Sequence, residues 1–132
     1  MIKNLDSIKG ITIEADPLQI REVFGNILNN AFDAIPAEKG QIKIMAENED
    51  EFIKVTIEDS GVGIAKDILE KIFEPFFTTK AKGTGLGLSV CRQIINMHEG
   101  EIGVKSELGQ GTSFIVRLPK KERKNKWPLN EF

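Results

Sequence analysis

Three patterns in the sequence could do chemistry, and the first is a glycine-rich stretch. Residues 82–90 read KGTGLGLSV, with three glycines in five positions directly before a predicted helix. Glycine leaves backbone N–H groups accessible, and a helix N-terminus favours an anion because its unpaired amides and its dipole are both positive. The stretch therefore predicts an anion-binding loop, although a tight turn or a flexible hinge would have the same composition.

The second pattern is a row of polar residues on the predicted helix that begins near Asp16. Glu22, Asn26 and Asn30 are spaced four apart, so their side chains lie on one face of the helix. Asparagine is a mediocre helix former, and a neutral amide oxygen can bind Mg²⁺ while phosphates supply further oxygens. The row predicts a polar site, but a plain solvent-exposed face is an alternative that this helix alone slightly favours.

Asp59 ends a predicted strand and is followed by Gly61 and Gly63. An ionised carboxylate only accepts hydrogen bonds, so Asp59 could bind the exocyclic amine of adenine and reject guanine, which has a carbonyl there. An Asx-type turn is the alternative, and it explains Asp59 better when the residue is considered alone.

Composition limits the class of protein that positions these residues. The chain has 132 residues, 40% hydrophobic and 29% charged, as expected for one soluble globular domain. A net charge of -2 predicts no nucleic-acid partner, and the absence of a long apolar stretch or signal peptide predicts a cytoplasmic domain without membrane contact. The single cysteine, Cys91, excludes an internal disulfide and is expected in the core.

Hydrophobic periodicity predicts the elements. Strands are expected at 11–15, 41–48, 51–59, 100–107 and 111–119, the second and third forming a hairpin. Helices are expected from Pro17 to about 35, near 66–72 and at about 90–97, the last closed by Gly100 as a C-cap. The irregular stretch from 61 to 85 reads as a functional lid or a disordered segment. The predicted fold is an α/β two-layer sandwich, with a mixed, mostly antiparallel sheet of about five strands covered on one face by three helices.

Five motifs in a fixed order make the chain resemble the catalytic ATP-binding domain of sensor histidine kinases, in the GHKL superfamily with its Bergerat fold. The motifs are NILNNAFDA, DSGVGI, IFEPFF, GTGLGLSV and GQGTSF, and the short FEPFFTTK segment is similar to the nitrogen-regulatory branch. The resemblance covers residues 11–119. It leaves 1–10 as an expected linker remnant and 120–132 as a basic tail.

The resemblance implies a role for each matching residue. Asn30 would hold Mg²⁺ through its side-chain oxygen, Asn26 would contact the phosphates or the metal's water shell, and both would be catalytic. Asp59 would bind the adenine amine with Thr112 nearby, and the amides of residues 85–88 would bind the phosphates. Phe73, Phe76 and Phe77 would hold the lid, and Lys80 or Lys82 could reach a phosphate or simply be solvated. The implied ATP/ADP-binding residues are Asn26, Asn30, Asp59, Gly61, Gly63, Ile64, Phe73, Phe77, Lys80, Gly83, Thr84, Gly85, Leu86, Gly87, Leu88 and Thr112.

One departure qualifies the resemblance, and a difference from hydrolysing relatives bears on the implied reaction. Asp33 lies where many members carry a basic residue, so another charge such as Lys80 would have to neutralise phosphate, or nucleotide would bind more weakly. Asn26 lies where hydrolysing relatives such as gyrase, Hsp90 and MutL carry a glutamate, and Glu22 is a further turn away. Since an amide cannot accept a proton, the resemblance implies phosphoryl transfer rather than hydrolysis.

The phosphate acceptor is expected on another domain. His98 precedes Glu99 and Gly100 at a helix end and reads as a structural residue. The implied partners are therefore the dimerisation and histidine-phosphoacceptor domain of the same kinase and, through the full kinase, a response regulator receiver domain. A GHKL-fold serine kinase of the anti-sigma type and a nucleotide-binding module without chemistry remain alternatives.

Overall fold

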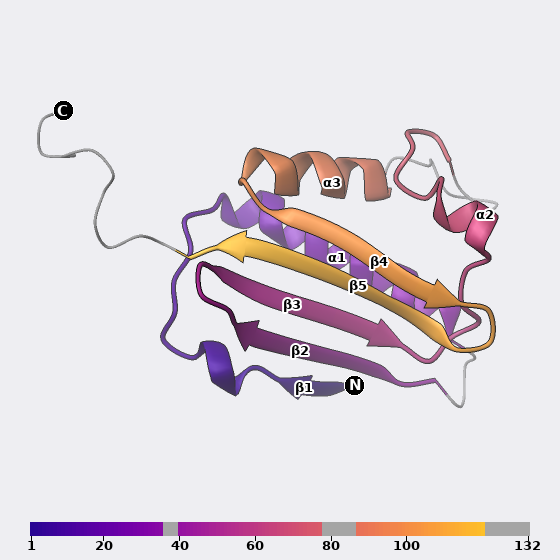
Figure 1. The fold of residues 1–132 in the computed structure, drawn as a ribbon, viewed down its shortest axis with the longest axis horizontal. Helices are drawn as coiled ribbons and strands as arrows, with labels where there is room; N and C mark the ends of the chain where they lie inside the picture. The colour runs from indigo at the N-terminus through magenta and orange to yellow at the C-terminus, as the bar shows by residue number, and fades with distance from the viewer. Residues whose placement is uncertain (36–39, 78–86, 121–132) are drawn as a thin grey trace, which may run out of the picture.

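A computed structural model describes residues 1–35, 40–77 and 87–120. The elements are the strand β1 (Ile2–Asn4), the short 3₁₀ helix η1 (Asp6–Ile8), α1 (Pro17–Ala34), β2 (Ile42–Asn48), β3 (Phe52–Asp59), α2 (Lys66–Leu69), α3 (Gly87–Met97), β4 (Glu101–Glu107) and β5 (Gly111–Pro119). Figure 1 shows the strands as one layer and the helices α1 and α3 as a second layer over one face of the sheet. The predicted two-layer sandwich is confirmed.

The sheet has five strands in the order β1-β2-β3-β5-β4. β1 runs parallel to β2, and the pairs β2–β3, β3–β5 and β4–β5 are antiparallel. The predicted hairpin and the predicted mixed, mostly antiparallel sheet are therefore confirmed.

The position of the first strand was predicted wrongly. Residues 11–16 have no regular structure, whereas Ile2–Asn4, expected to belong to a linker, form the edge strand β1. A strand needs a partner with unpaired backbone groups, and β1 already occupies the free edge of β2. The apolar alternation at 11–15 reflects side-chain burial instead, because Ile13 packs against the core without joining the sheet.

α1 begins where the sequence predicts. Asp16 is the N-cap, and its Oδ1 accepts the backbone N–H groups of Leu18 at 2.9 Å and Gln19 at 3.3 Å. Pro17 occupies the first turn, where its missing N–H costs nothing. The helix then buries Val23, Ile27 and Ala31 at helical spacing against the sheet, which leaves Asn26 and Asn30 on a neighbouring face.

The core lies between the two helices and the inner face of the sheet. Its most deeply buried side chains are Val23, Ile27, Cys91, Ile95 and Val116. Cys91 is a core residue, as predicted, and burial raises the pKa of its thiol.

α3 ends in a Schellman motif whose details differ from the predicted glycine C-cap. The N–H of Gly100 bonds to the carbonyl of Ile95 at 2.9 Å, and the N–H of Glu99 bonds to that of Asn96 at 3.0 Å. The left-handed residue is Glu99, with φ 60°, and not Gly100. Gly100 is required for a different reason, because a Cβ there would lie 2.3 Å from the carbonyl oxygen of Arg117.

His98 joins this helix end to the start of α1. Its Nδ1 lies 2.8 Å from the carbonyl oxygen of Ile94, and its Nε2 accepts the backbone N–H of Asp16 at 3.1 Å. Both bonds are satisfied when Nδ1 carries the proton. The structural role expected for His98 agrees with these contacts.

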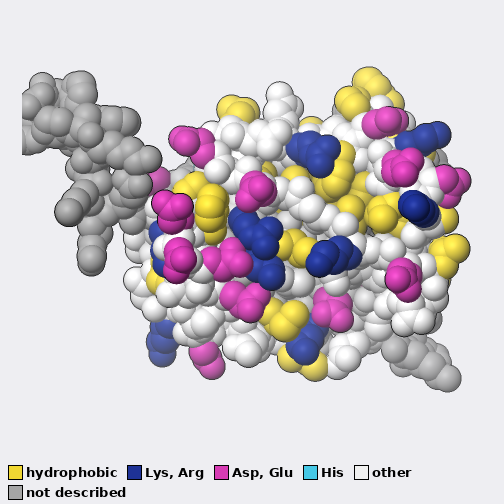
Figure 2. All heavy atoms as spheres, in the orientation of Figure 1, with side chains coloured by type: hydrophobic (Ala, Val, Ile, Leu, Met, Phe, Trp, Pro, Cys, Tyr) yellow, Lys and Arg dark blue, Asp and Glu magenta, His cyan; other side chains and the backbone are white. Residues whose placement is uncertain are grey.

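The outer face of the sheet carries intermixed positive and negative side chains (Figure 2). Two ion pairs cross it, Lys54 to Glu47 at 3.4 Å and Arg117 to Glu49 at 3.0 Å. An antiparallel sheet commonly exposes one such polar face to water. In the described part of the chain, none of the helices combines the length and apolar character needed to cross a membrane.

Candidate functional site

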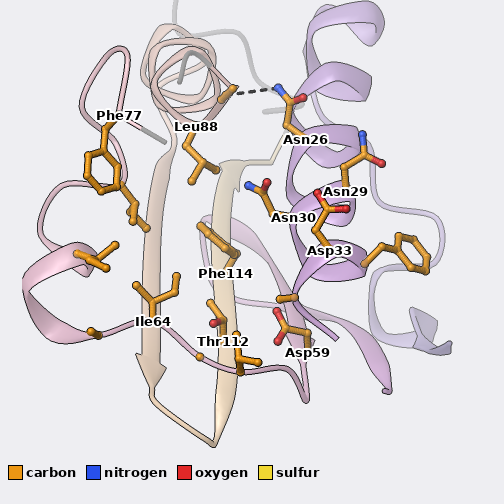
Figure 3. Close-up of a pocket in the computed structure, with 18 of the residues that line it drawn as sticks. Asn26, Asn29, Asn30, Asp33, Asp59, Ile64, Phe77, Leu88, Thr112 and Phe114 are labelled. Atoms are coloured by element: carbon orange, nitrogen blue, oxygen red, sulfur yellow. Dashed lines mark hydrogen bonds between the residues drawn. The ribbon is translucent and has the colours of Figure 1, made fainter. Parts of the chain in front are cut away.

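A cleft of about 800 Å³ opens between α1, the loop after β3, the segment around α2, the start of α3 and the ends of β4 and β5. This volume is typical of a site for a small molecule. Its lining residues are Asn26, Asn29, Asn30, Phe32, Asp33, Ala34, Asp59, Val62, Gly63, Ile64, Ala65, Ile68, Ile72, Phe77, Gly87, Leu88, Leu108, Thr112 and Phe114. In Figure 3, Asp59 and Thr112 lie at one end of the cleft, and Asn26 and Leu88 lie at the other.

The wall formed by α1 carries the polar row. Asn26, Asn30 and Asp33 line the cleft, and Figure 3 shows Asn30 and Asp33 pointing from the helix towards it. Glu22 is exposed and does not belong to the lining. The row predicted from spacing therefore faces a site through its two asparagines, and Asp33 extends it by one further turn.

The orientation of the Asn26 amide follows from its neighbours on α3. Its Nδ2 donates to the carbonyl oxygen of Gly87 at 3.4 Å and to the Cys91 thiol sulfur at 3.7 Å. Because the Gly87 carbonyl can only accept, the amide nitrogen must face α3. The Asn26 side-chain oxygen takes no part in these two bonds.

Asp59 lies at the opposite end and is only 5% exposed. Its Oδ1 accepts the backbone N–H of Gly61 at 2.8 Å, so the Asx-type turn considered from the sequence is present. Burial raises the pKa of Asp59, while the backbone N–H groups of Gly61 and Thr112 oppose that rise. The same carboxylate lines the cleft, so Asp59 can accept the Gly61 N–H and still accept a hydrogen bond from a ligand.

The two glycines after Asp59 hold the loop against its neighbours. A Cβ on Gly61 would lie 2.4 Å from the Ala34 carbonyl oxygen, and one on Gly63 would lie 2.0 Å from that of Glu107. Gly63 also has φ +78°, which disfavours any other residue. Gly63 lines the cleft and Gly61 does not. The structure therefore gives Gly61 a packing role instead of a place in the cleft wall.

The phenylalanines of the FEPFF segment play different roles. Phe73 does not line the cleft. Its ring packs edge-on against Phe114, with centroids 6.4 Å apart, and the Arg92 guanidinium lies 4.2 Å from its centroid. Phe77 lines the cleft, whereas Phe76 is 76% exposed and has φ 66°. Phe73 thus fixes the segment to the core, and Phe77 presents an apolar face to the cleft.

The predicted site residues divide into three groups. Asn26, Asn30, Asp59, Gly63, Ile64, Phe77, Gly87, Leu88 and Thr112 meet at the cleft. Gly61 and Phe73 lie beside it and support it. Lys80, Lys82, Gly83, Thr84, Gly85 and Leu86 lie outside the described residues.

Sequence reasoning missed an exposed apolar part of the lining. Phe32, Val62 and Leu108 are 51%, 63% and 66% exposed and all line the cleft. Val62 lies between two glycines, and Leu108 comes directly before Gly109. Apolar residues beside loop glycines would have been the available signal. The described residues contain no group of three or more His, Cys, Asp or Glu side chains placed to hold a metal.

The fold is thus a mixed sheet covered on one face by helices, with a cleft that has the Asn26 amide at one end and the buried Asp59 carboxylate at the other. Residues 15–122 match the family model described as "Histidine kinase-, DNA gyrase B-, and HSP90-like ATPase". The chain belongs to this family of ATPase domains.

Known proteins similar to this chain include sensor histidine kinases. Sensor histidine kinase ZraS of Escherichia coli K12 is 45% identical over 107 residues, covering 81% of this chain and 23% of ZraS. The catalytic domain of histidine kinase ThkA superimposes with a TM-score of 0.79 and 41% identity, over 90% of this chain and 77% of that one. Full-length ShkA in complex with AMPPNP has a TM-score of 0.77 and 31% identity, over 90% of this chain and 25% of ShkA. The chain spans less than a third of the length of its curated relatives.

Proposed function

We propose that this chain is the ATP-binding catalytic domain of a two-component sensor histidine kinase, which binds Mg-ATP and donates the γ-phosphate to a histidine on a separate dimerisation domain. The observation that carries the proposal is that the two ends of one cleft carry different polar groups. A buried carboxylate at Asp59 lies at one end, and the side-chain amide of Asn26 lies at the other beside the start of α3. That arrangement suits a ligand with a hydrogen-bond donor at one end and anionic groups at the other.

The adenine end is formed by Asp59 and its neighbours. The carboxylate accepts the exocyclic amine of adenine and repels the carbonyl that guanine carries at the same position. Gly63 lets a flat ring approach the backbone, because no side chain projects there. Ile64, Ile72 and Phe114 supply apolar lining on which the ring is buried.

The phosphate end is formed by α1 and α3. Asn30 is the proposed Mg²⁺ ligand through its side-chain oxygen, and the Asn26 side chain would contact the metal's water shell or the phosphates. Amide and phosphate oxygens are the ligand type that Mg²⁺ prefers, so these residues fit that cation. The backbone amides at the start of α3, at Gly87 and Leu88, favour the negative charge of the phosphates. When bound, Mg²⁺ neutralises charge on the transferring phosphoryl group.

Transfer rather than hydrolysis is the proposed reaction. Phosphoryl transfer depends mainly on positioning and charge stabilisation. Asn26 occupies the place of the glutamate base of hydrolysing relatives, and its amide cannot accept a proton from water. The residues of this chain therefore hold the nucleotide while the nucleophile, a histidine nitrogen, comes from the partner domain.

The proposed setting is a cytoplasmic two-component system. A solved ThkA chain that resembles this one, with a TM-score of 0.75 and 37% identity, is in complex with the response regulator protein TrrA. This supports a response regulator receiver domain as the final partner of the full kinase. The phosphoacceptor domain is the direct partner of the chain described here.

A trans-phosphorylation assay tests the proposal. The chain is incubated with γ-labelled ATP and Mg²⁺, with and without a separately purified dimerisation and phosphoacceptor domain. We expect acid-labile label on the acceptor histidine, and none on that domain when its histidine is replaced by glutamine. Acid-stable label on a serine would favour the anti-sigma type of kinase. Saturable ATP binding without label on any acceptor would favour a nucleotide-binding module.

A further inference from the structure

We propose that Ser106 sets the hydrogen-bond polarity of the adenine end of the cleft by accepting a hydrogen bond from the Thr112 hydroxyl. Thr112 lines the cleft and is 5% exposed, whereas Ser106 is half-buried behind it and does not line the cleft. Ser106 would therefore be a positioning residue that acts through Thr112. This inference rests on the proposed function, because it concerns how the same site selects its nucleotide.

Ser106 lies at the centre of three hydrogen bonds. It pairs across the sheet with Thr112, and the two hydroxyl oxygens are 2.8 Å apart. Its Oγ also accepts the backbone N–H of Ile64 at 2.8 Å and lies 2.9 Å from the carbonyl oxygen of Gly111. One side chain thus connects β4, β5 and the loop that forms the cleft wall.

Counting protons assigns a direction to each bond. A serine hydroxyl has one proton and two lone pairs. The Gly111 carbonyl can only accept, so the Ser106 proton must point to it, since otherwise two sets of lone pairs would face each other at 2.9 Å. One lone pair of Ser106 receives the Ile64 N–H. The remaining lone pair receives the proton of Thr112, which is therefore the donor of the bond between the hydroxyls.

The direction of this bond makes Thr112 a hydrogen-bond acceptor inside the cleft. Because its hydroxyl proton is donated to Ser106, Thr112 presents only lone pairs to a ligand, and the Asp59 carboxylate beside it also only accepts. The two residues face each other across the ladder between β3 and β5. This end of the cleft is then a surface of acceptors, which selects a base bearing an amino group and disfavours one bearing a carbonyl.

Removing the Ser106 hydroxyl should weaken that selection. In Ser106→Ala the Thr112 hydroxyl loses its acceptor and can donate a hydrogen bond to a carbonyl in the cleft instead. We expect the ratio of the inosine triphosphate Kd to the ATP Kd, measured by calorimetry with Mg²⁺, to fall about three- to tenfold. Ser106→Thr, which keeps a hydroxyl, should restore the ratio. Ser113→Ala is the matched control and should leave the ratio unchanged, because side chains alternate along β5 and Ser113 lies on the opposite face from Thr112. Equal weakening of both nucleotides in Ser106→Ala would mean a purely structural role and overturn the inference.

A second variant keeps the test independent of whether Ser106→Ala folds. Thr112→Val preserves shape but removes the oxygen. If Thr112 accepts from the amino group, ATP affinity should fall about three- to tenfold, while affinity for purine riboside triphosphate, which lacks that group, should change less than about twofold. Equal losses for the two nucleotides would mean that Thr112 does not accept from the amino group, and would refute the inference. Saturable ATP binding by the unsubstituted chain separately checks the proposed function, because its absence would refute that function whatever the selectivity ratios.

Discussion

Asp59→Asn is the substitution that separates the role of Asp59 in the turn from its role in binding. The asparagine oxygen can still accept the Gly61 N–H, which bonds to Oδ1 at 2.8 Å, so the loop should keep its shape. What is lost is the negative charge at a site that is 5% exposed. A hydrogen bond to a charged group is worth about 1.5–3 kcal/mol, so ATP should bind roughly ten- to a hundredfold more weakly.

Isothermal calorimetry with Mg-ATP measures this loss, and circular dichroism with urea unfolding checks the fold. Since burial already penalises the carboxylate, the substitution should not lower the free energy of unfolding by more than about 1 kcal/mol at neutral pH. Unchanged affinity in a folded variant would refute the reasoning, because Asp59 would then be only a turn residue.

The pH dependence gives the same prediction a second test. Burial raises the pKa of Asp59 in the folded state, so the folded chain binds this proton more tightly than the unfolded chain does. The free energy of unfolding contributed by Asp59 therefore falls as pH rises from the unfolded pKa through the folded pKa. When the pH is lowered through this range, the unsubstituted chain should become more stable relative to Asp59→Asn. Over the same range it should lose its advantage in ATP affinity over Asp59→Asn, because the protonated carboxyl no longer carries a charge. Parallel pH profiles for the two proteins would contradict the raised pKa.

Three other predictions test other parts of the account. Gly63→Ala should lower the free energy of unfolding by about 2–4 kcal/mol, because Gly63 has a positive φ and a Cβ there would lie too close to the Glu107 carbonyl oxygen. The control Gly103→Ala, with nothing near its Cβ position, should leave the free energy of unfolding unchanged or raise it by up to about 1 kcal/mol. If urea unfolding showed equal destabilisation by Gly63→Ala and Gly103→Ala, the close approach of the Glu107 backbone to Gly63 would be refuted. Glu99→Gly should stabilise the chain by about 0.5–1 kcal/mol by relieving the left-handed backbone, and a lower melting temperature would contradict this. Asn30→Ala should remove the Mg²⁺ dependence of ATP binding, and a calorimetric titration with an unchanged metal requirement would exclude Asn30 as the ligand.

Much of the fold could be predicted because local signals agreed with tertiary packing. Asp16 and Pro17 determine the start of α1 through capping chemistry that depends on neighbouring residues alone. The β2–β3 hairpin follows from alternation on both sides of a polar turn, and the structure pairs Ile44 with Ile57 across it. Such features need no knowledge of the rest of the chain.

The errors arose where a distant partner decides the outcome. The stretch at 11–15 alternates like a strand, but whether it joins the sheet depends on which segment occupies the edge of β2. β1 has only three residues, all exposed, so periodicity could not identify it. Similarly, Gly100 marks the end of α3, yet its close approach to Arg117 comes from packing against β5.

The candidate site was only partly indicated by local patterns. Spacing places Asn26 and Asn30 on one helix face and Asp59 follows a predicted strand, but each pattern alone favoured a simpler alternative, and the resemblance implied the nucleotide site. The hydroxyl of Ser106 gave no such signal, because its connection to Thr112 exists only once β4 and β5 pair. Long-range contacts of this kind require the folded structure.

Calorimetric titration of the purified chain with ATP and Mg²⁺, alongside GTP, tests the central claim most directly. The account predicts saturable binding of ATP that weakens when Mg²⁺ is removed, and much weaker binding of GTP. A natively folded chain that shows no saturable heat with millimolar ATP, or that binds GTP equally well, would contradict it.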